Sequence, residues 1–182
     1  LVAEGFEAGG HNGFEENTTL TLLPMLRKMV HLPLIAAGGI ATGSQMLATF
    51  ALGAEGVQIG SLFAASEESS AHIHFKQKIV ESGDGATALM MKKLVPVRLM
   101  KNDFFKEIQQ AEAEGADAEQ LKTLLGRGRA KKGMFEGDMQ NGELEIGQAA
   151  ALIDAVRPVQ AIFDQLLQEW EQSRKYLQNL SL

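Results

Sequence analysis

The stretch LPLIAAGGI (residues 32–40) is a continuous apolar run that closes on two adjacent glycines. The segment after it, TGSQMLATFALG (42–53), has the apolar spacing of a helix, with Thr42 or Ser44 as the N-cap and Gly53 at its end. A strand that is apolar on both faces and leads directly into a helix is typical of a parallel sheet covered on both sides. We therefore expect a β–α unit of an α/β fold here.

The same pattern occurs on either side of this unit. LVAEG (1–5) is a short apolar strand, and a helix is expected over 18–30. A third strand is expected over 54–64, broken at Gly60, and a helix follows it over 69–82. The repeat of ~25–30 residues is the size of a β–α unit. Three such units are about three-eighths of a TIM barrel or half of a doubly wound sheet, and both folds remain open at this point.

The remainder of the chain has a different texture. Residues 96–142 are charged, helical in pattern and poor in strand signals, with helices expected over 102–115 and after Asp117. GRGRAKKG (126–133) is predicted to be a basic loop that is solvated, with a phosphate or an acidic carrier protein as alternative partners. We divide the chain into β–α units (1–95), a mainly helical insertion (96–142) and C-terminal helices that pack back on the first part (143–182).

Composition and charge narrow the function classes. The chain has 182 residues, 45% hydrophobic and 22% charged, which is enough for one domain with a packed core. Its formal net charge of −6 argues against a nucleic-acid partner, because a phosphate backbone requires a basic face. The lack of cysteine excludes disulfides and thiolate metal sites and fits a cytoplasmic protein. No apolar run approaches the ~18 residues of a membrane span, so no membrane partner is expected.

Glycines occur at the end of each expected strand. In parallel α/β folds ligands bind at this edge of the sheet, and glycine lets backbone N–H groups approach an anion. The helix that begins near Thr42 adds a partial positive charge, which suits phosphate. The alternative is that these glycines only form tight turns, and no G-x-G-x-x-G fingerprint is present. The predicted phosphate cradle consists of Gly38 and Gly39, with Gly60 and Ser61 as a second contribution.

His11 is the imidazole that follows the first of these strands, in EAGGHNG (7–13). Because its unperturbed pKa lies near 6.5, it is a candidate general acid or base, with a surface-loop histidine as the alternative. His31 is expected to cap a helix end, and His72 and His74 are two apart on a helix, a spacing that does not favour a shared metal. No metal site is expected.

Two polar residues lie in the apolar strands. Glu4 is near the end of the first strand and Gln58 is in the third. A buried polar group needs a partner, so both are candidates to hydrogen-bond a ligand.

Several motifs occur in series: AEGFEAGGHNG (3–13), PLIAAGGIATG (33–43), LGAEGVQIGSLF (52–63), SEES (66–69) and GELEIGQAAALI (142–153). Together they resemble the nitronate monooxygenase and flavin-dependent enoyl-ACP reductase group, whose members are FMN-binding TIM barrels. The resemblance runs from residue 1 to about 155. PVRLMKN (96–102), followed by a helical segment, is similar to the enoyl-reductase branch.

The resemblance implies that the chain is the C-terminal part of a TIM (β/α)8 barrel with an added helical segment. The chain begins at Leu1 inside an apolar segment, and the family's first strands have no counterpart here. We therefore expect the chain to begin around the fifth strand and to need the missing N-terminal half of the barrel. The apolar stripe of the last helix is expected to cover the barrel or a partner such as a second copy of the chain; its residues are Leu166, Leu167, Trp170 and Leu177.

The resemblance also implies site roles. His11 matches the catalytic histidine of the family. An arginine often follows the position of Ser61, and this chain has Leu62 in its place. The residues implied to contact FMN are Ala8, Gly9 and Gly10 beside the flavin, and Gly38, Gly39, Gly60 and Ser61 at the phosphate.

The implied activity is that of an FMN-dependent oxidoreductase. The first expectation is an enoyl-ACP reductase of type II fatty-acid synthesis, in which NADPH or NADH reduces a trans-2-enoyl thioester on acyl carrier protein through FMN. The alternative is a nitronate monooxygenase, in which His11 would abstract the α-proton of a nitroalkane. Alternatives of another class are a non-catalytic module that binds a phosphate ligand, or a half-protein that is inactive alone.

Overall fold

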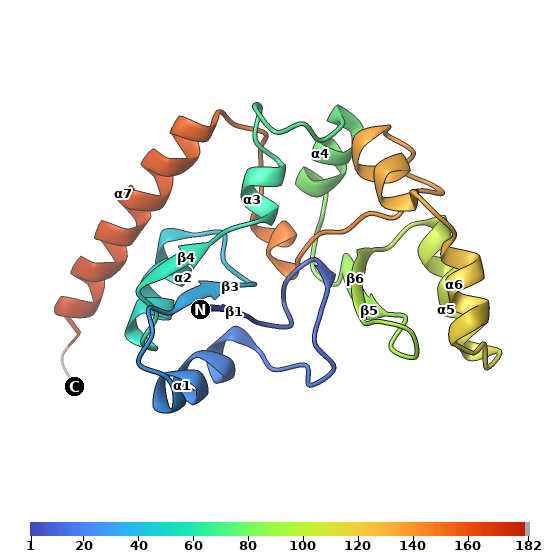
Figure 1. The fold of residues 1–182 in the computed structure, drawn as a ribbon. Helices are drawn as coiled ribbons and strands as arrows, with labels where there is room; N and C mark the ends of the chain where they lie inside the picture. Colours follow the sequence, from blue (N-terminus) through green and yellow to red (C-terminus); the bar gives the residue numbers. More distant parts are fainter. Residues whose placement is uncertain (181–182) are drawn as a thin grey trace.

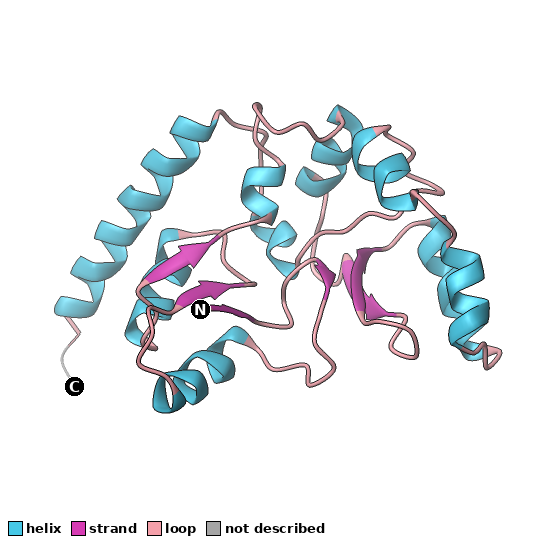
Figure 2. Cartoon of the chain, in the orientation of Figure 1, coloured by secondary structure: helices cyan, strands magenta, loops and turns pink. Residues whose placement is uncertain are grey.

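The computed structural model describes residues 1–180 and contains a parallel sheet built from the predicted apolar runs (Figures 1 and 2). Its strand order is β1-β3-β4, with Ala3 opposite Ala36 and Ala36 opposite Val57. The first three predicted strands and the two helices between them are confirmed. Their bounds are β1 Val2–Glu4, α1 Thr19–Met29, β3 Ile35–Ala37, α2 Gly43–Ala51 and β4 Gly56–Gln58.

The core of this layer is formed by small strand residues and larger residues from α1 and the adjoining loops. Leu23, Leu34 and Ala36, which lies on the central strand β3, are completely buried in one cluster. Because the strands carry alanine at their buried positions, the helices pack close to the sheet. Because the three strands pair in parallel, the carboxyl ends of β1, β3 and β4 lie at one edge of the sheet.

The third predicted strand is shorter than expected. β4 ends at Gln58, and the residues after Gly60 form a short helix, α3 Ser61–Ala64. The apolar side chains in SLF therefore belong to a helical turn, which a continuous apolar run does not distinguish from a strand. The next helix, α4 Ile73–Val80, lies within the predicted range.

A second, antiparallel sheet was not predicted. It has the order β2-β6-β5, from β2 Gly10–His11, β6 Val97–Met100 and β5 Thr87–Met90. β6 lies in the segment predicted to be mainly helical. All four of its residues are buried, but the charged Arg98 interrupts the apolar run, and a sequence pattern places an arginine in solvent.

Two helices then cover the second sheet, as expected for the charged segment. They are α5 Asp103–Ala113 and α6 Ala118–Leu125, and Asp117 forms the predicted N-cap. The shared core contains Phe104, Phe105 and Leu121. In Figure 1 this pair lies at the opposite end of the molecule from the C-terminal helix α7.

The C-terminal part differs in detail from the two predicted helices. A π-helical turn, η1 Lys131–Phe135, precedes an extended segment, and the first expected helix is only a short 3-10 helix, η2 Gln148–Leu152. The second, α7 Val159–Gln178, packs against α2. Its predicted apolar stripe is divided: Leu166 is buried and Trp170 contacts Phe50 at 5.0 Å between ring centroids, but Leu167 and Leu177 are exposed. Among the described residues, no helix combines the length and the apolar character that crossing a membrane requires.

Candidate functional site

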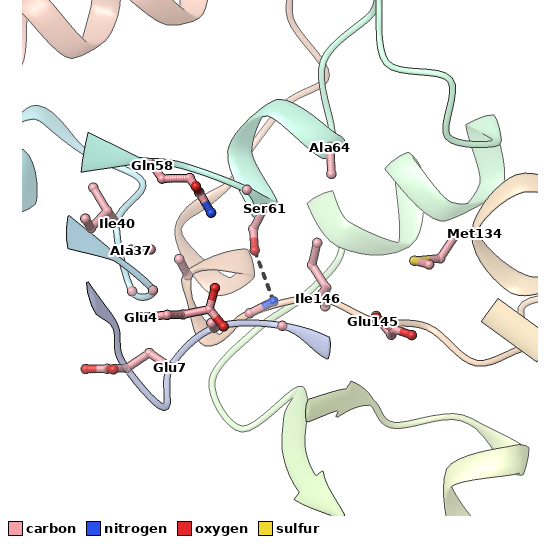
Figure 3. A pocket seen from close by; sticks show the side chains of 17 residues that line it. Glu4, Glu7, Ala37, Ile40, Gln58, Ser61, Ala64, Met134, Glu145 and Ile146 are labelled. Atoms are coloured by element: carbon pink, nitrogen blue, oxygen red, sulfur yellow. Dashed lines mark hydrogen bonds between the residues drawn. The ribbon is translucent and has the colours of Figure 1, made fainter. Parts of the chain in front are cut away.

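A cavity of about 330 Å³ opens at the carboxyl ends of β1, β3 and β4 (Figure 3). This volume lies within the usual ~300–1,000 Å³ of ligand pockets. The structure brings together eight of the residues predicted for cofactor binding. They are Glu4, Ala8, Gly9, Gly38, Gly39, Gln58, Gly60 and Ser61.

The paired glycines after β3 have backbone conformations that other residues rarely adopt. Gly38 has φ +87° and Gly39 has φ +73°. A Cβ on Gly38 would lie 2.7 Å from the carbonyl oxygen of Gly5, and one on Gly39 would lie 3.2 Å from Cβ of Glu7. The loop therefore requires glycine twice. Within residues 1–180, the amide N–H groups of Gly38 and Gly39 donate to no backbone acceptor, which leaves them free for an anionic ligand.

Glu7 and Thr19 support this loop from behind, and sequence reasoning did not identify either. The Glu7 carboxylate accepts from the backbone amide of Thr19 at 3.0 Å and from its hydroxyl at 3.1 Å. The Thr19 hydroxyl also lies 2.9 Å from the carbonyl oxygen of Gly38. Since Glu7 caps the first turn of α1 with a negative charge, it fixes the helix and the glycine loop together.

The second half of the cradle follows β4. A Cβ on Gly60 would meet no atom within 4 Å, so this glycine leaves open space in the cavity. The amide of Ser61 donates to no backbone acceptor within the described residues. The Ser61 hydroxyl accepts a hydrogen bond from the amide of Gly147 at 3.0 Å, drawn as a dashed line in Figure 3.

The segment around Gly147 forms a wall of the cavity that was absent from the predicted site residues. The amide of Gln148 donates to the carbonyl oxygen of Glu7 at 2.9 Å. A Cβ on Gly9 would lie 2.4 Å from the carbonyl carbon of Ile146, so glycine at position 9 is explained by backbone packing. The motif GELEIGQAAALI was the only sequence signal for this wall. The added lining residues there are Glu145, Ile146, Gly147 and Ala149.

At the helix N-terminus predicted to hold phosphate, several amides already donate to side chains of the chain itself, which does not favour that part of the prediction. The amide of Gly43, the first residue of α2, donates to the Glu169 carboxylate at 2.8 Å. The amides of Ala41 and Thr42 donate to the side chain of Gln45. A carboxylate from α7 therefore offsets the partial positive charge at the start of α2.

Glu4 and Gln58 both line the cavity, as Figure 3 shows. Partial burial raises the pKa of Glu4 above its ordinary value. Within residues 1–180 no protein group donates a hydrogen bond to the Glu4 carboxylate. This carboxyl group is therefore available to a ligand.

His11 and Gly10 are not among the residues that line the cavity. His11 is exposed on β2, opposite Val97, and Gly10 is buried opposite Arg98. The catalytic role of His11 stays a prediction. Among the other histidines, Nδ1 of His72 caps α4 by accepting from the amide of His74 at 3.2 Å, whereas His31 follows the C-cap residue Val30 and does not cap α1 itself.

Two of the four basic side chains in the segment 126–133 are paired with carboxylates. Lys131 pairs with Glu136 at 3.1 Å and Lys132 pairs with Asp138 at 2.9 Å. Arg129 stacks on Phe104, with Cζ 4.2 Å from the ring centroid. These pairings do not favour an anion-binding role for the segment.

Comparison with known proteins places this fold and cavity in a family. The family model for nitronate monooxygenase matches residues 1–169. The chain belongs to the nitronate monooxygenase family. Relatives named "Probable nitronate monooxygenase" from Staphylococcus saprophyticus and from Staphylococcus aureus strain JH9 are each 32% identical to it, over 84% and 97% of the chain.

Solved structures of the nitronate monooxygenase fold extend the comparison. FabK from Thermotoga maritima is 40% identical over 97% of the chain, with a TM-score of 0.90. Nitroalkane oxidase from Streptomyces ansochromogenes is 31% identical over 97%, with a TM-score of 0.77. The α/β fold therefore resembles both enzymes. The chain spans about half the length of each: 46% and 52% of the staphylococcal relatives, and 56% and 52% of the two structures.

Proposed function

We propose that this chain forms the phosphate-binding side of an FMN site in an enoyl-ACP reductase that uses NADPH or NADH. The observation that carries the proposal is the similarity to FabK, 40% identity and a TM-score of 0.90 over 97% of the chain. FabK is the enoyl-ACP reductase branch that the motif PVRLMKN resembles. In this proposal residues 1–95 supply the C-terminal β–α units of a TIM barrel.

The residues of the cavity fit the phosphate end of FMN. Gly38 and Gly39 offer amide N–H groups in a loop that admits no Cβ, and Ser61 adds a third amide across the cavity. Oriented amides of this kind bind a phosphate without a lysine or arginine. The eight predicted residues that meet at this cavity are proposed to contact the cofactor, with Glu4 and Gln58 holding its polar groups beyond the phosphate.

When bound, FMN supplies the hydride-transfer chemistry between the nicotinamide and the β-carbon of the enoyl thioester. The chain's own residues hold and shield it: Ala8 and Gly9 form one wall, and Ile146 packs behind Gly9. We propose that His11, on the strand that follows this wall, holds the proton that the reaction requires. The acyl carrier protein that presents the thioester is a proposed partner, and so is a second copy of the chain.

A second candidate is a nitronate monooxygenase with the same cofactor. The names of the staphylococcal relatives favour it. In this reading His11 removes the α-proton of a nitroalkane, and O₂ is the oxidant. Both activities require the same phosphate cradle, so the cradle does not separate them.

Anaerobic flavin kinetics separate the candidates. The purified protein should be yellow from bound flavin, and NADPH or NADH should bleach it. Crotonyl thioester should then restore the oxidised spectrum. Turnover of an alkyl nitronate without reduction by either nicotinamide would refute the reductase and support the monooxygenase. If the full-length protein, with both halves of the barrel present, is colourless and does not take up FMN, both enzyme candidates are refuted, and a module for another phosphate ligand is left.

A substitution at His11 tests its role within this function. We expect His11→Ala to keep FMN bound, because His11 is outside the cavity, and to lower turnover by on the order of 10²–10⁴-fold, as for a lost acid–base group. The measurement is kcat at saturating substrate together with the flavin content. An unchanged kcat would refute the catalytic role and leave His11 as an ordinary surface residue.

A further inference from the structure

Arg98 is a charged side chain buried deep in the second sheet, with only 2% of its surface exposed. Its Nε and Nη2 both donate to the carbonyl oxygen of Phe6, at 3.1 and 2.8 Å. Nη1 lies 3.4 Å from the Thr87 hydroxyl, and Cζ lies 4.6 Å from the centroid of the Phe6 ring. Within residues 1–180 the guanidinium forms no salt bridge.

This arrangement has an energetic cost. Burial disfavours the charged form and lowers the pKa of Arg98, and the more distant carboxylates of Glu7 and Glu16 offset this only in part. Burying a charge without a paired carboxylate costs free energy that an apolar side chain of similar length, such as methionine, avoids. The guanidinium is therefore expected to perform a task that packing alone does not require.

The contacts of Arg98 indicate what this task is. Its backbone pairs with Gly10 across the antiparallel ladder, and the preceding residue, Val97, pairs with His11. Its side chain holds the carbonyl of Phe6, on the other side of the loop Glu7–Gly9. One residue thus fixes both ends of the loop that lines the cavity, together with the strand that carries His11.

We propose that Arg98 is a positioning residue for His11. Arg98 acts by holding the Phe6 carbonyl against β6 through its two hydrogen bonds. The inference rests on the proposed function, since it assumes that His11 takes part in turnover. Lysine does not replace the planar guanidinium of Arg98, whose Nε and Nη2 donate together, because the lysine ammonium is a single point charge on a flexible side chain.

A double-mutant cycle in the flavin-loaded protein tests the proposal. The variants are Arg98→Met, His11→Ala and the two combined, and the matched control is Lys101→Met, an exposed residue just after β6. We expect Arg98→Met to lower kcat by about 10- to 100-fold, as for a displaced catalytic group. FMN should stay bound through the glycine loops, and Lys101→Met should have no effect.

The combined variant decides between positioning and a general structural role. If Arg98 acts through His11, the double variant is as slow as His11→Ala alone, because the two losses are not additive. Additive losses would overturn the proposal. If Arg98→Met does not fold, Arg98→Lys replaces it in the same cycle, with an intermediate kcat expected and the same non-additivity required.

The outcomes also separate this proposal from the proposed function. Wild-type protein without flavin, or His11→Ala with full activity, would refute the proposed function and this inference with it. An active flavoprotein in which the Arg98 and His11 losses add would refute the inference alone.

Discussion

Glu143 is a buried carboxyl group whose titration should be visible in the stability of the protein. It is 6% exposed, and burial, together with the nearby Glu145, raises its pKa to about 7, although Arg129 opposes the shift. The ordinary value is 4.5. The folded state therefore binds the proton more tightly than the unfolded state does.

The sign of the pH dependence follows directly. The stabilisation by protonated Glu143 is fully present below about pH 4.5 and is lost as the pH rises through about 7. We expect Glu143→Gln, which cannot ionise, to remove this loss, so that the variant gains stability relative to wild type as the pH rises. Urea midpoints at several pH values measure it, with the exposed Glu107→Gln as the control. A difference between wild type and Glu143→Gln that does not change with pH would contradict the assignment.

Gly39 tests the phosphate cradle at the scale of one residue. Its φ of +73° disfavours any side chain by about 1–2 kcal/mol, and a Cβ would press on Glu7. We expect Gly39→Ala to weaken FMN binding by at least about tenfold, because the loop must shift. Gly53→Ala is the matched control, since Gly53 also has a positive φ of +100° but does not line the cavity. Equal FMN affinities in the two variants, measured by fluorescence titration, would argue against the cradle.

At the scale of elements, one carboxylate links the start of α2 to α7. The Glu169 carboxylate accepts hydrogen bonds from the amide of Gly43 and, at 2.7 Å, from Nε2 of Gln165. The side-chain oxygen Oε1 of Gln165 in turn accepts from Arg157. A Cβ on Gly43 would lie 2.2 Å from the carbonyl oxygen of Leu166, so the two helices meet backbone to backbone. The start of α2 is therefore held by α7 as well as by its own capping box.

Removing that carboxylate should destabilise the fold by about 1 kcal/mol, the usual cost of a lost helix cap. Glu169→Ala tests this in urea denaturation. Glu169→Gln should lie close to wild type, because its amide oxygen still accepts from Gly43. The control is Glu171→Ala, an exposed residue whose bridge to Arg174 stays within α7. If Glu169→Gln is as destabilised as Glu169→Ala, the hydrogen bond from the Gly43 amide does not account for the contribution of Glu169 to stability.

The elements also show how far the sequence predicts this molecule. β1, β3 and β4 follow from apolar runs that end in glycine, and α2 follows from its apolar spacing, with Thr42 confirmed as the N-cap from the two candidates Thr42 and Ser44. β6 could not be predicted because Arg98 interrupts its apolar run, and the burial of that charge depends on the folded structure. For the site, the glycines at strand ends were sufficient to locate the cavity.

The rest of the site depends on contacts between distant parts of the chain. Gly147 and Ser61 are 86 residues apart, and Glu169 and Gly43 are 126 apart. No local pattern encodes such pairings, so the wall at Gly147 and the closure of α2 by Glu169 appear only in the folded structure. The exposed position of His11 likewise results from its pairing with Val97, which required β6 to be known.

At the scale of the whole molecule, segments far apart in the sequence form the cavity together. Its lining comes from residues near 4–9, 38–40, 58–61 and 145–149. A ligand bound there links β1, β3, β4 and the segment before η2. Binding to the folded state alone raises the free energy of unfolding by RT ln(1 + [L]/Kd). The cavity should therefore report its ligand through the stability of the entire fold.

We expect FMN at about one hundred times its Kd to stabilise the protein by about 2.7 kcal/mol, seen as a higher melting temperature. Riboflavin, which lacks the phosphate, should stabilise it far less at the same concentration, because the free amides of Gly38, Gly39 and Ser61 then have no anion to bind. Differential scanning fluorimetry with both compounds, and with inorganic phosphate as a third, makes the comparison. Equal shifts with riboflavin and FMN would show that the glycine loops do not hold the phosphate, since the two compounds differ only in that group.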